Sequence, residues 1–379
     1  MDHELQIDWL RLIRSPGMGA ATVGQLIRHL GTPEALLTAT AKSLRTLPGL
    51  RSDTLRVLEG FRREIPAQPM ARELERLQGL GGRMIMLGTP DYPELLAAIH
   101  DPPSALFVIG DATLLHQTTT IAITGTRTAT PRGQMFALHL TQELTRAGVV
   151  TMSGLSAGID AAVHRAALEI QGPTVAVLAT GLDVCHPREH RELQQRIKGQ
   201  GCLVSEAFLG LLPVPWAFPL RARVLTGLTR GVVIVEAPEK SGSLLTARLA
   251  LDQGREVFAV PGLPNDPASR GTHGLLRQGA RLVEGAQDIL EELPWCRPVP
   301  LSVAEPLRSG APPPEVTNEV AAVLTSIQAG MSQEDELARC CQLTVAALSR
   351  ILLQLELSGL VARLPGGRYA ATSRTGTGM

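Results

Sequence analysis

Apolar residues recur three and four positions apart through the first part of the chain, which is the spacing of amphipathic helices. Within residues 1–65 the pattern involves Leu10, Leu12, Ile13, Val23, Leu26, Ile27 and Leu30. Two breaks, SPGMG at 15–19 and LPGL at 47–50, separate the helical stretches. They fit either paired helix-hairpin-helix (SAM-like) units, which can aim backbone N–H groups at a phosphate, or plain turns in a helical bundle. We expect a helical domain over 1–65 and then a connector over 66–82 containing one charged helix, Met70–Gly79.

Short apolar runs alternate with helical patterns from residue 83 to residue 295. The runs are β-branched and nearly continuous in hydrophobicity, as strands buried on both faces of a parallel sheet are. They are Ile121–Thr124, Val149–Ser153, Thr174–Ala179, Cys202–Ser205, Val232–Glu236 and Val257–Val260. The helices expected between them include Gly133–Ala147, Ala161–Ile170, Arg188–Lys198 and Leu244–Gln253. This alternation predicts an α/β fold with a doubly wound parallel sheet.

The C-terminal region divides into a linker, a small module and a tail. Six prolines predict an extended, semi-stiff linker over 296–315. Over 316–372, three helical patterns are followed by two short strands around a Gly366-Gly367 turn, which is the winged-helix layout. The tail, 373–379, is expected to be disordered.

Charge and cysteine usage narrow the functional classes. The 36 basic and 36 acidic residues balance, so any site for a polyanion must be local. Only Lys42, Lys198 and Lys240 are lysines, and the arginine bias suits phosphate recognition, although we attribute the bias mainly to a GC-rich genome. The five cysteines form no C-x-x-C pair, which makes a zinc site or a disulfide framework unlikely. Because neither a signal peptide nor an apolar membrane span is recognisable, we expect a soluble cytoplasmic protein.

Small, hydroxyl and arginine residues follow the predicted strands. In an open parallel sheet, ligands bind beyond the carboxyl ends of the strands. Glycine lets a phosphate approach the backbone, hydroxyls and helix N-termini donate to it, and arginine supplies charge. Each turn alone also fits an ordinary tight turn or helix cap, but together they predict a phosphate-binding edge. Its candidate residues are Gly125, Thr126, Arg127, Ser153, Gly154, Arg188, Phe218, Arg221, Arg223, Ser241, Gly242, Ser243 and Thr246.

Signals of enzymatic chemistry are weak. The chain has neither a P-loop nor a G-x-G-x-x-G after the first predicted strand. Asp160 and Glu236 lie at element ends, but no base–nucleophile pair can be placed beside them. His164 fits a packed side chain better than a general base, and His186 with His190 lacks further ligands for a metal. We therefore expect no catalytic residue, no metal and no cofactor.

A series of motifs resembles, in order, the motif string of the DNA-processing protein A (DprA, or Smf) family. After a lead-in, YPELLAAIHDPPSALFVIGD, the motifs are GTRTATPRG, SGLSAGIDAAVHRAAL, GPTVAVLATGLDVCHPREH, LVSEAFLG, FPLRARVLTGLTRGVVIVEA, SGSLLTARLALDQGREVFAVPG and GTHGLLRQGA. They span roughly residues 92–290, and the terminal domains resemble the accessory domains of longer members. The resemblance implies an extended Rossmann-like domain that binds single-stranded DNA. It also implies homodimerisation and loading of the RecA recombinase onto incoming DNA in transformation.

The same resemblance assigns residues by motif. Arg127 stands where the family's Gly-x-Arg arginine contacts DNA, and Arg188 stands where a lysine usually follows Tyr-Pro. Phe218, Arg221 and Arg223 belong to the segment similar to the family's FPxRNR.

The chain also departs from the family pattern. His186 replaces the usual tyrosine before Pro187, His190 replaces an asparagine, and Ala222 replaces the asparagine of FPxRNR. These changes keep the positive charges but remove an aromatic platform and an amide. They predict that phosphate contact is retained and put base stacking at those positions in doubt.

Two other functional classes remain open. Nucleotide-hydrolysing enzymes of the lysine-decarboxylase-like type share the broad fold, but their PGGxGTxxE loop corresponds here to Ser241–Ala247, which has no glutamate. A winged-helix transcription regulator needs a basic recognition helix, whereas Thr344–Ser358 holds Arg350 as its only base, together with Glu356. We expect the module to serve protein contact or regulation.

Overall fold

The structure of the chain is a computed structural model that divides into two compact units, Met1–Pro300 and Leu301–Met379. In the first unit it describes residues 3–293 apart from 46 and 48–51. In the second it describes 318–371 apart from 329–333, 342, 345–346, 349–350, 353–354, 356–360 and 365–367. The predicted linker, the predicted tail and most of the second helix break therefore lie outside the described residues.

The N-terminal segment is helical, as predicted. Its helices are α1 (His3–Ile13), α2 (Ala20–Leu30), α3 (Pro33–Thr38), α4 (Ala41–Arg45), α5 (Ser52–Glu64) and α6 (Ala67–Gly79). The first Gly-Pro break joins α1 to α2, and Gly17 takes a positive φ of 83° there, a conformation that favours glycine. Helix α6 is the charged helix expected in the connector, and it packs against α1.

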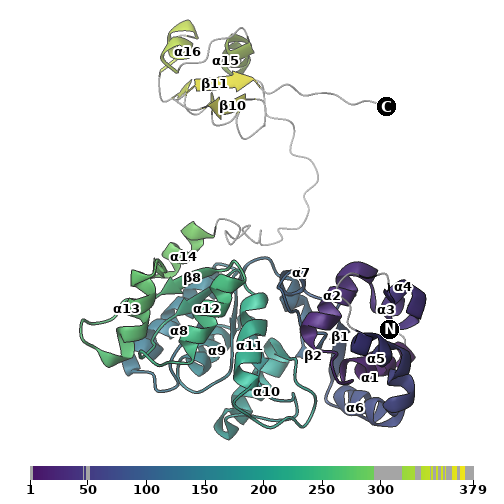
Figure 1. Cartoon of the computed structure of the whole chain (residues 1–379). Helices are drawn as coiled ribbons and strands as arrows, with labels where there is room; N and C mark the ends of the chain where they lie inside the picture. Colours follow the sequence, from purple (N-terminus) through teal and green to yellow (C-terminus); the bar gives the residue numbers. More distant parts are fainter. Residues whose placement is uncertain are drawn as a thin grey trace. The chain divides into compact units, whose positions relative to one another are not determined.

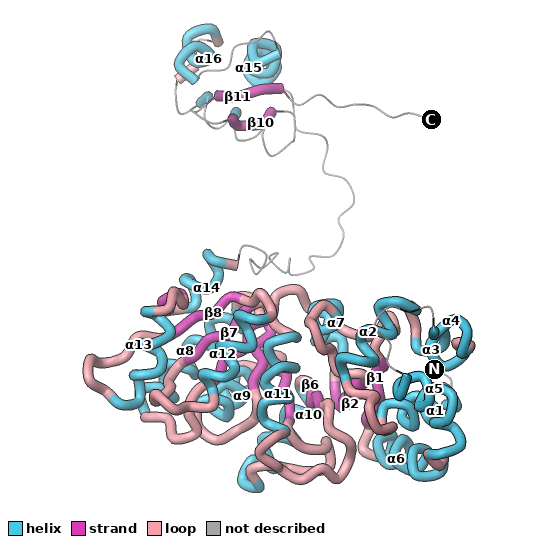
Figure 2. Tube along the Cα trace, in the orientation of Figure 1, coloured by secondary structure: helices cyan, strands magenta, loops and turns pink. Residues whose placement is uncertain are grey.

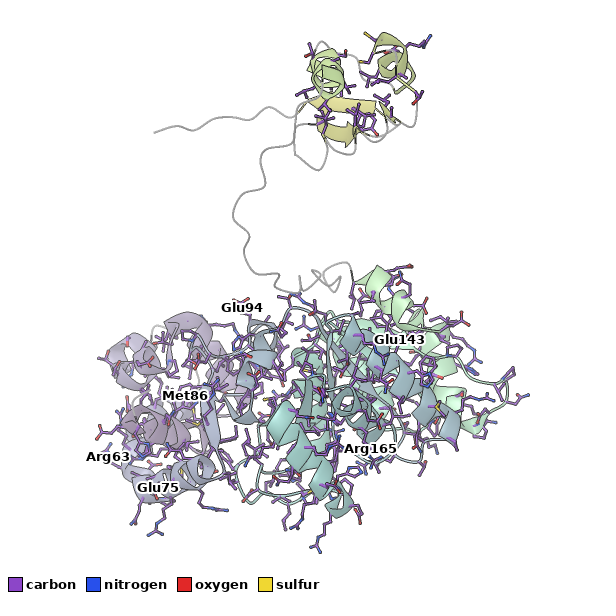
Figure 3. All side chains as sticks on the ribbon, turned by 180° about the vertical axis from the view of Figure 1, so that it is seen from behind. Arg63, Glu75, Met86, Glu94, Glu143 and Arg165 are labelled. Carbon is purple, nitrogen blue, oxygen red and sulfur yellow. The ribbon has the colours of Figure 1, made fainter. Side chains whose placement is uncertain are left out.

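The helical segment and the sheet share one core (Figure 3). The indole N–H of buried Trp9 on α1 donates to the carbonyl of Ser104 at 2.9 Å. Figure 3 labels Met86, which is fully buried at the edge of the sheet against these helices, and Arg63 and Glu75, which are exposed on the helices. The predicted helical domain is therefore packed against the sheet within the first unit.

The sheet has nine strands in the order β1-β2-β6-β5-β4-β3-β7-β8-β9. They are β1 (Gly82–Met86), β2 (Ala105–Gly110), β3 (Thr120–Thr124), β4 (Val150–Ser153), β5 (Thr174–Leu178), β6 (Cys202–Ser205), β7 (Gly231–Ile234), β8 (Glu256–Ala259) and β9 (Arg281–Leu282). All six predicted strands are present, with ends within one or two residues of the predicted ones. The strands from β3 to β9 pair in parallel.

The sheet is mostly parallel, which confirms the predicted fold class, and two antiparallel strands extend it at one edge. Strand β1 pairs antiparallel with β2, and β2 pairs antiparallel with β6. These two strands and the two-residue β9 were not predicted. Their pairing joins segments distant in sequence, such as Phe107 of β2 opposite Ser205 of β6, so local pattern carries little signal for it.

Helices cover both faces of the sheet (Figures 1 and 2). Helix α8 packs on α9 and α9 on α10, while α11 packs on α12. The bounds of the helices in this part are α7 (Glu94–Ala97), α8 (Pro131–Arg146), α9 (Ile159–Glu169), α10 (Arg191–Gln200), α11 (Ala217–Gly227), α12 (Ser243–Asp252), α13 (Arg270–Arg277) and α14 (Ala286–Glu292). The predicted helix Arg188–Lys198 is divided into a 3-10 turn, η2 (Arg188–His190), and α10.

The strand order creates a switch point between β3 and β7. From β3 the chain adds β4, β5 and β6 in one direction, and it then returns to place β7 and β8 on the other side of β3. Right-handed crossovers therefore send the helices after β3 and β7 to opposite faces of the sheet. A crevice opens between two strands of this kind at their carboxyl ends, and ligands of doubly wound folds bind there.

The second unit is a winged-helix domain. It contains α15 (Asn318–Gln328), α16 (Glu334–Cys340) and an antiparallel pair, β10 (Val361–Leu364) and β11 (Arg368–Ala371). Parts of the predicted third helix, and the Gly366-Gly367 turn, lie outside the described residues. The apolar side chains predicted for that helix contribute to the core at Leu348, Ile351, Leu352 and Leu355.

Candidate nucleic-acid interface

A cavity of about 570 Å³ opens at the switch point. Its walls are the turn after β3, residues at the start of α9, the first turns of α11 and α12, and the loop that leads from β7 to α12. The sequence brings these segments together because each follows the carboxyl end of a strand in the parallel part of the sheet.

The turn after β3 is held by Glu236. The backbone N–H of Thr126 donates to the carbonyl of Glu236 at 2.7 Å. The buried carboxylate of Glu236 accepts from the N–H of Thr130 at 2.9 Å and from its hydroxyl at 2.5 Å. Thr130 caps α8, so this carboxylate lies at the positive end of the helix. The arrangement presents Arg127, which is exposed, at the cavity.

The turn after β4 is held by a second buried carboxylate, Asp160. One oxygen accepts from the hydroxyl of Thr124 at 2.7 Å, and the other accepts from the N–H of Ser156 at 3.2 Å and lies 3.8 Å from Arg221 Nη1. The same Arg221 nitrogen donates to the carbonyl of Gly154 at 2.8 Å and to the hydroxyl of Ser156 at 2.9 Å. A Cβ on residue 154 would lie 2.3 Å from that nitrogen, so a larger residue there would displace the guanidinium from this position. These contacts fix the guanidinium of Arg221 at the cavity wall.

The ring of Phe218 contacts two of the arginines that line the cavity. Phe218, on the first turn of α11, has the guanidinium of Arg127 4.7 Å and that of Arg221 5.6 Å from its centroid. The ring of His186 meets Phe218 edge to face at 6.2 Å. Burial, and then the charge of Arg127, lowers the pKa of His186, so the imidazole is neutral at pH 7 and the arginines carry the positive charge here.

The loop before α12 adds hydroxyls and a lysine. Ser241 and Ser243 share a hydroxyl–hydroxyl hydrogen bond of 2.7 Å, and the N–H of Ser243 donates to Ser241 Oγ at 3.3 Å. Gly242 precedes the first residue of α12, and Thr246 lines the cavity one turn later. Lys240 is exposed at the same wall. A helix start next to a lysine favours an anion, because the helix dipole places partial positive charge there.

Nine of the thirteen predicted site residues line this cavity, and four do not. Those that line it are Gly125, Thr126, Arg127, Phe218, Arg221, Ser241, Gly242, Ser243 and Thr246. Ser153 is fully buried, and its hydroxyl donates to the carbonyl of Ile123 at 2.6 Å. Gly154 contributes its carbonyl to the positioning of Arg221. Arg188 is exposed on η2, beyond the cavity lining.

Arg223 is the fourth, and it faces away from the cavity. Its side chain is 6% exposed and pairs with the carboxylates of Asp101 at 3.0 Å and Glu206 at 2.5 Å. Burial alone would lower the pKa of Arg223, but these two carboxylates raise it. Arg221 and Arg223 stand two positions apart on α11, about 200° around the helix axis, so they cannot face the same way. The contacts give Arg223 a structural role where the sequence predicted a DNA contact.

Eight of the seventeen residues that line the cavity were not among the predicted ones, and three of these eight carry charge or position Arg221. Lys240 is one of only three lysines and directly precedes the Ser-Gly-Ser turn, which is a signal that could have identified it. Ser156 and Asp160 lie in the motif after β4, but only the folded chain shows that they reach Arg221.

His164 is a packed residue, as expected. It is fully buried, and its Nδ1 lies 2.9 Å from the hydroxyl of Thr174, which itself donates to the carbonyl of Thr151. Among the described residues, no group of three or more His, Cys, Asp or Glu side chains is placed to hold a metal. No helix in the described ranges is both long enough and apolar enough to cross a membrane.

Three family models match the chain in succession. The model described as DNA recombination-mediator protein A matches residues 83–294. The model of the DprA-like N-terminal HHH domain matches residues 3–55, and the model of the DprA winged helix domain matches residues 308–367.

Individual relatives give the same result. The chain is 43% identical to the DNA processing protein DprA of Bacillus subtilis over 229 residues, which are 60% of this chain and 76% of the relative. It is 38% identical to the protein Smf of Escherichia coli over 322 residues, 83% of this chain and 84% of the relative.

Two solved structures share its fold. The DprA structure from Streptococcus pneumoniae has a TM-score of 0.67 and 32% identity, covering 76% of this chain and 97% of that one. The DprA structure from Helicobacter pylori, described as having a unique single-stranded DNA binding mode, has a TM-score of 0.52 and 29% identity. It covers 57% of this chain and 97% of that one.

Proposed function

The chain belongs to the DNA recombination-mediator protein A (DprA/Smf) family, and from that premise we propose that it binds single-stranded DNA, without regard to sequence, in the switch-point cavity. One observation carries the proposal. Three cations, Arg127, Arg221 and Lys240, converge on one cavity with the hydroxyls and helix N-terminus of its walls. In a chain of zero net charge, such a local concentration is what a polyanion needs.

The cavity suits phosphates better than bases as its main ligand. Arginine can grip a phosphate with two hydrogen bonds, and the N-terminus of α12 adds the partial positive charge of the helix dipole. Contacts to the phosphate backbone carry no sequence information, so binding should be sequence-independent. The single-stranded DNA binding of the Helicobacter pylori relative supports the same ligand here.

Membership of this family also suggests which proteins this chain binds. We propose that the protein acts as a homodimer in the cytoplasm, protects incoming single strands and loads RecA onto them during natural transformation or recombination. Large apolar side chains exposed away from the switch-point cavity, such as Leu251, Leu263 and Leu282, support contacts with protein partners. Arg188 remains a proposed DNA contact on η2, outside the cavity.

We propose no enzymatic activity. The two carboxylates nearest to the cavity are already engaged: Glu236 accepts two hydrogen bonds from Thr130, and Asp160 accepts from Thr124 and Ser156 next to Arg221. A carboxylate held in this way is a poor general base, because its hydrogen bonds orient it toward its own turn rather than toward a ligand's proton.

Incubation with nucleoside monophosphates is expected to release no free base, and incubation with DNA is expected to produce no cleavage. Chromatography of the products checks both results. Steady product formation that disappears in Glu236→Gln or Asp160→Asn would contradict the binding-only proposal and favour the nucleotide-hydrolase class.

Replacing Arg127 with alanine is expected to weaken binding to every single-stranded sequence alike. It should also reduce the slope of log K against log salt by about 0.7, the contribution of one neutralised phosphate on a single strand. Arg127 is exposed and its replacement leaves the folded core intact, so the loss reports on binding. Fluorescence anisotropy of labelled single- and double-stranded oligonucleotides, at several salt concentrations, measures the slope.

Arg165→Ala is the matched control. Arg165 is exposed on α9, outside the cavity lining, and is labelled in Figure 3. Its replacement removes the same charge but should leave the slope unchanged. Equal slopes for Arg127→Ala and the wild type would place the phosphates elsewhere, and tighter binding of the duplex than of the single strand would favour the transcription-regulator class.

A further inference from the structure

A second cavity, of about 430 Å³, lies on the other side of the first turn of α11. Its walls include the ends of β5 and β6, the segment 206–211 and α11 itself. Trp216, which directly precedes α11, lines this cavity. We call it the Trp216 cavity.

Helix α11 separates the two cavities. Ala217, Leu220 and Val224, three and four positions apart on one helix face, line the Trp216 cavity. Phe218 and Ala222 line the switch-point cavity, and Arg221 lines both. The two cavities are therefore neighbours that share the wall carrying the proposed phosphate-binding arginine.

The aromatic residues at the two cavities differ in what they already contact. Phe218 is covered by the guanidinium groups of Arg127 and Arg221 and by the edge of His186. Trp216 is 59% exposed, and within the described part of the chain its indole has no ring, cation or hydrogen-bond partner. The ring that is free to stack on a ligand is therefore Trp216.

The lining of the Trp216 cavity suits an uncharged ring. It is mainly apolar. Of its two charged members, Glu206 pairs with Arg223, and Arg221 donates from Nη1 to Gly154 and to Ser156, which lines the switch-point cavity. A phosphate would meet the carboxylate of Glu206 there and no cation other than Arg221, whereas a flat aromatic ring would bury its faces against Trp216 and Leu220.

We propose that the Trp216 cavity receives a base of the same DNA strand whose phosphates lie in the switch-point cavity, and that the base stacks on Trp216. This inference rests on the proposed function. The helix between the cavities is about 10 Å across, which equals about three nucleotides at the 3.4 Å spacing of stacked bases. Phe218 then serves to orient the two arginines, and Trp216 serves as the stacking platform.

The test compares two ligands of equal length, dT20 and an abasic 20-mer that keeps the phosphates but lacks bases. Trp216→Ala is expected to weaken binding to dT20 roughly 5- to 150-fold, the range for loss of one stacked base. The salt slope should be unchanged, because no phosphate contact is removed. On the abasic strand, the wild type and Trp216→Ala should bind equally.

Intrinsic fluorescence gives an independent measurement. Stacking on dT20 should quench the wild-type emission, and Trp216→Phe should lose this quenching while keeping most of the affinity. Trp9 is fully buried and should not respond. Trp9 and Trp295 are both retained in Trp216→Phe, so the difference in quenching between wild type and variant reports on Trp216. Leu212→Ala is the matched control, because Leu212 is a large exposed side chain that precedes α11 but does not line the Trp216 cavity.

The outcomes separate the two proposals. In one outcome, Arg127→Ala reduces the salt slope for dT20, but Trp216→Ala binds dT20 as tightly as the wild type does. The proposed phosphate site then stands, and the Trp216 cavity holds no base. If Trp216→Ala loses the same affinity for both strands, Trp216 acts by supporting α11 and the proposal is wrong. If the wild type binds neither strand, the proposed function fails and this inference fails with it.

Discussion

Replacing Arg223 with methionine is expected to lower the free energy of unfolding by about 3 kcal/mol. Methionine keeps most of the packing of the arginine stem but removes the guanidinium that pairs with Asp101 and Glu206. Removing one member of a buried ion pair costs about 3–5 kcal/mol because the other charge is left uncompensated. We expect the lower end, since the Asp101 and Glu206 side chains remain 41% and 25% exposed. Thermal or urea unfolding followed by circular dichroism measures the loss.

Adding Glu206→Gln to Arg223→Met is the informative control. The second substitution removes the stranded carboxylate, so it should restore part of the lost stability. Where the single variant is still folded, its salt slope for single-stranded DNA should match that of the wild type. A slope lowered by about 0.7 with unchanged stability would instead restore Arg223 to the DNA contacts predicted from the sequence.

Acidification from pH 6.5 to pH 4 is expected to remove about 3 kcal/mol of stability through His164 alone. Burial lowers the pKa of His164 to about 4; the charge of His190 contributes in the same direction, and Asp160 opposes it. In the unfolded chain the pKa is near the ordinary value of 6.5. Between the two values the unfolded state binds a proton that the folded state does not, so stability falls with the pH. Above pH 6.5 the imidazole is neutral in both states, and below pH 4 the loss is complete.

His164→Asn isolates this effect from the other titrating groups. The asparagine amide can replace Nδ1 in the hydrogen bond to Thr174 but does not titrate. The difference in stability between wild type and variant should therefore change by about 3 kcal/mol across that pH range. His139→Asn, at an exposed position on α8, should show no such change. Parallel curves for wild type and His164→Asn would mean that His164 is protonated in the folded protein.

Much of the site could be predicted because its parts are local. Gly125–Arg127 directly follows β3, and Ser241–Ser243 lies on the loop from β7 to α12; the carboxyl ends of parallel strands meet at one edge of a sheet. The arginines were harder to assign. The segment similar to FPxRNR contains both Arg221 and Arg223. Only the packing around α11 decides that Arg221 lines the cavity and that Arg223 pairs with Glu206.

The amino-acid sequence by itself determined the parallel strands, the helices between them and the turns that line the switch-point cavity. Strands such as β3 are covered on both faces: Ile121 and Ile123 belong to one core cluster and Ala122 to the other. A strand buried on both faces needs a continuous apolar run, which can be recognised in the sequence. The tertiary structure alone decided the antiparallel addition of β1 and β2, the burial of Arg223 and the pairing of Arg221 with Asp160. The physical reason is that strand pairing across a sheet and charge pairing in a core depend on residues far apart in the chain, which a local pattern does not encode.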